Sequence, residues 1–265
     1  MLRVRIVLAS MLVSFIGGCA SVETAGGSSS LRSPVALSGA ALANPINMVV
    51  VDAGHGGHDP GTQHFGLREK NLALDISRKL KAELQNRGLT GVMTRESDQF
   101  IPLSGRPGVA NRLSADLFVS VHINANKNAG VSGAEVYYPR ESVVSGSAQW
   151  PPGIAAADIG FPSLIIKQVL WDLVLTRSRS QSRRLASTIC RSLHSTLGIA
   201  CRGPKAARFV VLRESWMPAV LVEVGYVSNH DEAQRLSLES YRQAAASAIA
   251  DGITNYTREQ GLQHI

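Results

Sequence analysis

From residue 48 onward, short apolar runs alternate with segments in which apolar residues recur at helical spacing. The run Met48 to Asp52 ends at a glycine-rich turn, which is typical of a buried strand. The segment Glu69 to Arg87 follows, and its apolar residues fall on one helix face at Leu72, Ile76, Leu80 and Leu84. This alternation predicts an α/β fold: a single domain with a mostly parallel central sheet flanked by helices.

The same patterns predict the remaining elements. Further strands are expected at residues 91–94, 116–121, 134–138, 209–212 and 219–224. Further helices are expected at residues 104–113, 164–175, 182–197 and across the apolar stripe from Tyr241 to Tyr256. The strands and helices together define a domain at residues 46–260.

Residues 1–18 have the pattern of a lipoprotein-type signal peptide. Two arginines precede an apolar stretch, Ile6 to Ile16, that is too short to span a bilayer comfortably. The segment ends in Gly17-Gly18-Cys19, which resembles a bacterial lipobox, so we expect cleavage before Cys19 and lipidation of its thiol. The alternative is an ordinary signal peptide that is cut nearby, with Cys19 incidental.

Residues 19–45 are rich in Ser, Gly and Ala and have no apolar period, so they are expected to form a tether. A tether of this length has a root-mean-square reach of roughly 25–30 Å. Several acyl chains on Cys19 would hold the domain on a membrane. The expected location is therefore the periplasm, with the protein anchored to the outer membrane.

The charge of the chain favours an anionic partner outside the cytoplasm. The formal net charge of +7 falls to +5 when residues 1–18 leave with two arginines and no acid. Mild positive charge suits an anionic polymer such as cell wall, or anionic lipid. Nucleic acid is not expected, because the basic cluster at residues 177–184 lacks interleaved aromatic residues. We expect a monomer.

The chain has three cysteines. If Cys19 is lipidated, Cys190 and Cys201 remain as a pair in an exported protein, where disulfides persist. A disulfide and two buried thiols are both compatible with this spacing.

Four ionisable residues lie where a strand ends or a helix begins: His55, Glu69, His122 and Glu223. Sites in open α/β sheets form at the carboxyl ends of strands, so these residues can converge. Two imidazoles and one carboxylate make a zinc site with an open position. Glu223 stands in an apolar strand, where burial raises the pKa of a carboxylate and suits it to accept a proton from water.

Each residue also has a structural interpretation. His55 could only line a glycine turn, and His122 could be a satisfied core histidine. Glu69 could favour the macrodipole of its helix. Glu223 could belong to a buried ion pair, for which the candidate partners are Arg95, Arg106 and Arg213. The nearby Asp59-Pro60-Gly61 is interpreted as a turn.

In this order the motifs resemble the zinc-dependent N-acetylmuramoyl-L-alanine amidases, the type-3 peptidoglycan amidases. The resemblance runs from Asn47 to Glu259 and is carried by the segments 52–57, 59–61, 69–70, 94–95, 115–122, 133–138, 217–226 and 228–229. It implies zinc ligands at His55, Glu69 and His122 and a catalytic glutamate at Glu223. Asn124 also falls on the family pattern and is expected to support the site.

The resemblance implies a peptidoglycan hydrolase. The expected reaction is cleavage, by zinc-activated water, of the amide between the lactyl group of N-acetylmuramic acid and L-alanine of the stem peptide. Two departures, Ala53 in place of the usual proline and Ile123 in place of a small residue, remove no ligand. The alternatives are a zinc peptidase acting within the stem peptide and a non-catalytic or autoinhibited peptidoglycan-binding relative.

Some family members carry a longer inserted helix that plugs the zinc and requires an activator protein. Here the segment from Pro139 to Pro162 is a modest insert whose only acids are Glu141 and Asp158. A full plug is therefore not expected. A partial lid stays open as an alternative, and an activator protein is a candidate partner.

Overall fold

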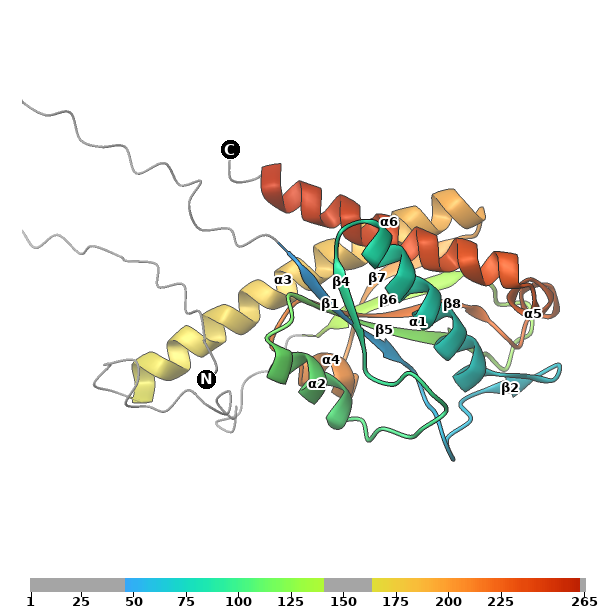
Figure 1. The fold of residues 1–265 in the computed structure, drawn as a ribbon, viewed down its shortest axis with the longest axis horizontal. Helices are drawn as coiled ribbons and strands as arrows, with labels where there is room; N and C mark the ends of the chain where they lie inside the picture. Colours follow the sequence, from blue (N-terminus) through green and yellow to red (C-terminus); the bar gives the residue numbers. More distant parts are fainter. Residues whose placement is uncertain (1–45, 141–163, 263–265) are drawn as a thin grey trace, which may run out of the picture.

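The computed structural model describes residues 46–140 and 164–262, with the backbone alone for 164–171 (Figure 1). The predicted signal peptide, the tether and Cys19 lie outside the described residues, as does most of the insert between Pro139 and Pro162. Within the described ranges, no helix is both long enough and apolar enough to cross a membrane.

A six-stranded sheet with the strand order β4-β1-β5-β8-β6-β7 forms the centre of the domain. Its strands are β1 (Met48–Ala53), β4 (Thr90–Met93), β5 (Leu117–Asn124), β6 (Ala134–Pro139), β7 (Cys201–Ala207) and β8 (Ala219–Tyr226). The pairings of β1 with β4 and β5, of β5 with β8 and of β6 with β7 are parallel, and only β6 with β8 is antiparallel. The predicted α/β fold with a mostly parallel sheet is confirmed.

The helices divide between the two faces of the sheet (Figure 1). They are α1 (Glu69–Asn86), α2 (Gly105–Leu113), α3 (Leu164–Leu197), α4 (Val210–Arg213), α5 (His230–Ser237) and α6 (Glu239–Leu262). Alternate residues of β1 enter different cores: Val49 and Val51 pack in the large core with side chains of α1, α3 and α6, whereas Val50 packs in a small core with α2 and α4. This alternation follows from the two-residue period of a strand.

Most predicted elements are present, but one was assigned the wrong type. Residues 209–212 were expected to form a strand, and the structure instead has the single turn α4, in which Arg213 N–H donates to the Phe209 carbonyl at 2.9 Å. A four-residue apolar run does not distinguish a strand from a buried helical turn. The two helices expected at 164–175 and 182–197 are one continuous helix, α3.

The structure also contains elements that the sequence patterns did not predict. They are β7, α5 and a two-stranded ribbon of β2 (Gln63–His64) and β3 (Leu67–Arg68). Strand β7 reads Cys-Arg-Gly-Pro-Lys-Ala-Ala, without apolar alternation, because it is an edge strand of the sheet and none of its residues is buried.

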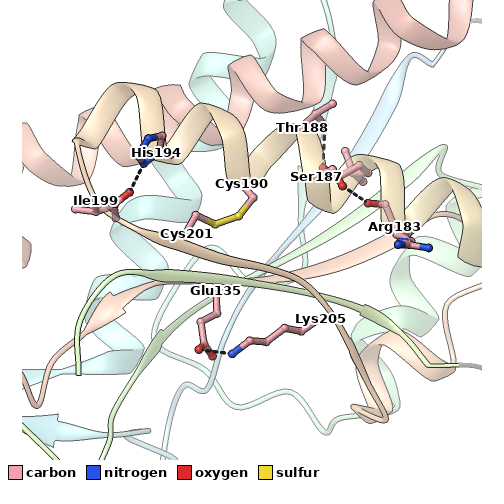
Figure 2. Close-up of a disulfide and its surroundings, with 10 residues drawn as sticks. Glu135, Arg183, Ser187, Thr188, Cys190, His194, Ile199, Cys201 and Lys205 are labelled. Carbon is pink, nitrogen blue, oxygen red and sulfur yellow. Dashed lines mark hydrogen bonds and ion pairs between the residues drawn. A yellow bond between two sulfur atoms is a disulfide. The ribbon is translucent and has the colours of Figure 1, made fainter. Parts of the chain in front are cut away.

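Cys190 and Cys201 form a disulfide with a Cα–Cα distance of 5.5 Å. Figure 2 shows this bond joining α3 to the first residue of β7. Of the two alternatives that the spacing allowed, the structure has the disulfide. It fastens the edge strand to the helix that covers it.

Candidate active site

The four predicted site residues meet near the carboxyl ends of neighbouring parallel strands. His55 follows β1, His122 lies near the end of β5 and Glu223 lies in β8, all on parallel neighbours. Glu69 is the first residue of α1. His122 and Glu223 are register partners across β5 and β8, so they share a face of the sheet.

His55, Glu69 and His122, here called the ligand cluster, offer three ligand atoms that lie within 4.8 Å of one another. Glu69 Oε1 lies 3.1 Å from His55 Nε2 and 2.9 Å from His122 Nδ1. The two imidazole rings stand edge to face with centroids 4.9 Å apart. This group could hold a metal ion, because two nitrogens and one oxygen, the donor types that zinc prefers, lie close together.

Glu69 is held by backbone donors as well as by the histidines. Its Oε1 accepts from Ile123 N–H at 3.1 Å and its Oε2 accepts from Thr62 N–H at 2.9 Å. Burial alone would raise the pKa of Glu69, but the hydrogen bonds and charges of His122 and His55 outweigh it and hold the pKa far below its ordinary value. Glu69 is therefore a charged carboxylate with a fixed orientation.

Asp59 holds the other ring nitrogen of His55, at 2.7 Å from Nδ1. The sequence interpretation gave Asp59 only a turn role, so this contact was missed. A metal-binding histidine commonly donates its second N–H to a carboxylate, which fixes the tautomer and the ring orientation. The Asp59 contact therefore fits a metal at the ligand cluster.

Glycines around His55 leave room that a side chain would fill. A Cβ at Gly54 would lie 2.4 Å from the His122 ring, and a Cβ at Gly61 would lie 2.5 Å from Glu69 Oε2. His55 itself has φ of 57°, a left-handed conformation that is costly for a residue with a side chain. The turn is thus shaped to bring the ligand cluster together.

Two buried arginines fix the backbone of this turn. Arg95 donates to the carbonyls of Ala53 at 2.9 Å and Gly54 at 2.7 Å. Arg106 donates to the carbonyls of Ala53 at 2.7 Å and His55 at 2.8 Å. Three successive carbonyls are therefore held in place by side chains from outside the turn.

Asp52, fully buried in β1, balances the charge of Arg106 at 3.1 Å. It also accepts hydrogen bonds of 2.7 Å from the hydroxyls of Thr94 and Ser120. Neither Asp52 nor the arginines were identified as site residues from the sequence. An aspartate within an apolar strand was the available signal, since a buried carboxylate needs partners.

Glu223 has a half-buried side chain whose Oε2 is covered and has no hydrogen-bond partner among the described residues. Burial raises its pKa to about 7, and the charges of Glu69 and Glu135 also raise it, against the opposing effect of His122. Arg106 and Arg213 pair with other acids, and Arg95 donates to backbone carbonyls. No ion pair of Glu223 is found among the described residues, so the ion-pair alternative is wrong.

A second polar group lies beside Glu223 and is here called the edge cluster. Its members are Glu135 and Tyr137 of β6, Arg202 and Lys205 of β7 and Tyr226 of β8. Glu135 is the register partner of Glu223 and receives hydrogen bonds from Lys205 at 2.6 Å and from Tyr137. Tyr226 lies near enough to help lower the pKa of Glu135. Asn124, expected to support the site, donates to Glu135 Oε2 at 3.4 Å and so contacts the edge cluster.

The family comparison agrees with this geometry. The profile of the family described as N-acetylmuramoyl-L-alanine amidase matches residues 49–255. The chain belongs to this family. The matched range contains the ligand cluster, Glu223 and the whole edge cluster.

Similar proteins carry the same description. N-acetylmuramoyl-L-alanine amidase AmiA of Escherichia coli K12 is 33% identical over 218 residues, which cover 79% of this amidase-family chain and 75% of AmiA. LytC of Bacillus subtilis is 33% identical and covers 82% of the chain, which spans only 37% of LytC. The solved catalytic domain of CwlV from Bacillus (Paenibacillus) polymyxa var. colistinus is 32% identical with a TM-score of 0.62, over 79% of this chain and 97% of that domain.

Proposed function

We propose that this chain hydrolyses the amide between the lactyl group of N-acetylmuramic acid and L-alanine of the stem peptide in peptidoglycan. Family membership and the amidases that the chain resembles support the reaction class. The observation that carries the proposal is the placement of Glu223 beside a cluster suited to a metal, with its covered Oε2 lacking a hydrogen-bond partner among the described residues.

The ligand cluster fits zinc. Two neutral imidazoles and one charged carboxylate are the donor set of many zinc hydrolases, and His55 is already oriented by Asp59. His55, Glu69 and His122 would hold the ion. When bound, zinc supplies a Lewis acid that polarises the scissile carbonyl and lowers the pKa of water.

Glu223 is proposed as the catalytic residue. Its raised pKa, about 7, allows it to accept a proton from the attacking water and to deliver that proton to the leaving alanine nitrogen. A carboxylate with an ordinary pKa would hold the proton too weakly to deliver it at neutral pH. The apolar surroundings of β8 therefore contribute directly to the proposed chemistry.

The test is digestion of purified peptidoglycan by residues 20–265, with and without a chelator, followed by mass spectrometry. We expect stem peptides with a free L-alanine amine and an intact glycan, with activity lost on chelation and restored by zinc. Cleavage inside the stem peptide would indicate the zinc-peptidase alternative. Intact peptidoglycan with zinc bound would indicate an autoinhibited or non-catalytic relative, and candidate activator proteins would then be added.

We also propose that the protein acts from a lipid anchor at Cys19 in the periplasm, as an outer-membrane lipoprotein with a tether at residues 19–45. The lipobox-like Gly17-Gly18-Cys19 and the Ser/Gly/Ala-rich segment after it support this proposal. Labelling of the expressed protein with a fatty-acid probe tests it. Wild type should be labelled and Cys19→Ala should not, and an unlabelled wild type would contradict the anchor.

A further inference from the structure

The edge cluster continues a row of ionisable side chains that begins at the ligand cluster. The register aligns His122, Glu223, Glu135 and Arg202 on the successive strands β5, β8, β6 and β7. In-register residues of neighbouring strands share a face, and the strands lie about 4.7–4.9 Å apart. The row therefore leads from the ligand cluster, past Glu223, to a cation on the edge strand.

Two cations on β7 can reach a ligand at the end of this row. The Lys205 side chain is 42% exposed, and its Nζ bonds to Glu135 at 2.6 Å and lies 5.8 Å from the centre of the Tyr137 ring (Figure 2 shows the Glu135 contact). Arg202 is exposed, and its charge lies close enough to Tyr226 to oppose the rise in the pKa of that phenol. Glu135 uses one of the three Lys205 N–H donors, so the others can bind an anion from solvent.

The path of the leaving peptide over the sheet follows from the proposed function, and the inference rests on that function. If the carbonyl is polarised at the ligand cluster and the leaving nitrogen is protonated by Glu223, the peptide beyond that nitrogen continues over β6 and β7. At about 3.3–3.6 Å per residue, the residue after L-alanine lies roughly 7 Å from the scissile nitrogen. Two strand spacings from β8 to β7 are about 9–10 Å, a gap that the Lys205 and Arg202 side chains can close.

We propose that Lys205 and Arg202 form a subsite for a carboxylate on the residue that follows L-alanine in the leaving peptide. Glu135 is a positioning residue in this subsite, because it is 5% exposed and fixes the Lys205 ammonium. The ligand class is an acidic peptide. The subsite discriminates between a free carboxylate, which accepts charge-assisted hydrogen bonds, and a carboxamide.

The test uses two synthetic disaccharide peptides that differ only in a free carboxylate or a carboxamide on the residue after L-alanine. We expect the zinc-loaded wild type to favour the carboxylate in kcat/KM by about tenfold, chiefly through KM. Lys205→Gln and Arg202→Gln should each bring this ratio toward one, and Lys205→Arg should retain part of it. Arg191→Gln is the matched control, because it removes the same charge from α3, where Arg191 pairs with Glu259.

The outcomes separate this inference from the proposed function. Equal cleavage of both substrates by wild type, or an equal fall on both in the Lys205 and Arg202 variants, overturns the subsite and leaves the amidase activity standing. Cleavage of neither substrate by the zinc-loaded wild type contradicts the proposed function itself, and the subsite falls with it.

Discussion

The ligand cluster and the edge cluster are joined by one row of in-register residues across the sheet but are held in different ways. The ligand cluster depends on backbone geometry: glycines without room for a Cβ, a left-handed His55 and arginines bonded to successive carbonyls. The edge cluster depends on side-chain contacts between strands and on the disulfide that fastens β7 to α3. Ligand atoms must sit at fixed distances from one ion, whereas a peptide-binding surface tolerates side-chain adjustment.

Because the two clusters are held in different ways, substitutions near the ligand cluster should change metal binding. Substitutions in the edge cluster should instead change substrate preference. Glu223 lies between the two groups, in register with His122 on one side and Glu135 on the other. A substitution of Glu223 therefore tests whether catalysis can be lost while metal binding is kept.

The largest effect is expected for Glu223→Gln. The amide keeps the shape of the side chain and cannot accept the proton from water, so turnover should fall by about 10²–10⁴-fold. Zinc content, measured by atomic absorption, should remain near one equivalent. His122→Ala is the contrasting variant and should lose the metal. If Glu223→Gln loses zinc in proportion to activity, Glu223 is a metal ligand. The distinction between the ligand cluster and a separate catalytic glutamate would then be wrong.

The next effect is expected for Arg106→Gln, which leaves Asp52 charged and buried without its partner. Removal of one member of a buried ion pair costs about 3–5 kcal/mol of the free energy of unfolding. Chemical denaturation of the metal-free protein measures it. Arg213→Gln is the control, because Arg213 forms an exposed pair with Glu214. Equal stability of the two variants would show that Arg106 does not hold the glycine turn.

The two clusters also differ in how much of them could be predicted from the sequence. The ligand residues were identified because each stands at the end of a regular local pattern, an apolar strand or an amphipathic helix. Their supports were not identified, because Arg95 and Arg106 act through backbone carbonyls more than 40 positions away. No local pattern encodes such a contact.

The edge cluster was missed for a physical reason. Strand β7 carries glycine, proline and two cations, and an exposed edge strand needs no apolar alternation. The antiparallel direction of β6 was equally hidden, since strand direction depends on the long connections and not on the residues of the strand. Glu135 and Lys205 meet only because β6 and β7 pair, although 70 positions separate them.

A smaller effect is expected when the disulfide is removed in the Cys190→Ser/Cys201→Ser double variant. Loss of a cross-link that closes a short loop costs about 3 kcal/mol of the free energy of unfolding. Because the bond anchors β7, the preference for an acidic peptide should weaken while zinc content stays at the wild-type level. Wild type treated with a reducing agent loses the same bond and should show the same two changes. Loss of zinc in the double variant would show that the two clusters are coupled.

The smallest effect is expected away from both clusters, at the ion pair of Asp75 in α1 with Arg242 in α6. Asp75 Oδ2 lies 2.5 Å from Arg242 Nε. Burial would raise the pKa of Asp75, but Arg242 and Lys79 outweigh it and hold the pKa below its ordinary value. A lowered pKa in the folded state contributes stability above the unfolded pKa, and that stability is lost as pH falls through the folded value. Arg242→Gln should therefore cost at most about 1 kcal/mol of the free energy of unfolding near pH 7, since Asp75 is partly exposed. The difference from wild type should shrink below about pH 4, and urea denaturation at both pH values measures it. A difference that is independent of pH would assign the effect to the hydrogen bonds that Arg242 donates to the carbonyls of Leu236 and Ser237. Zinc content and substrate preference should be unchanged in either case.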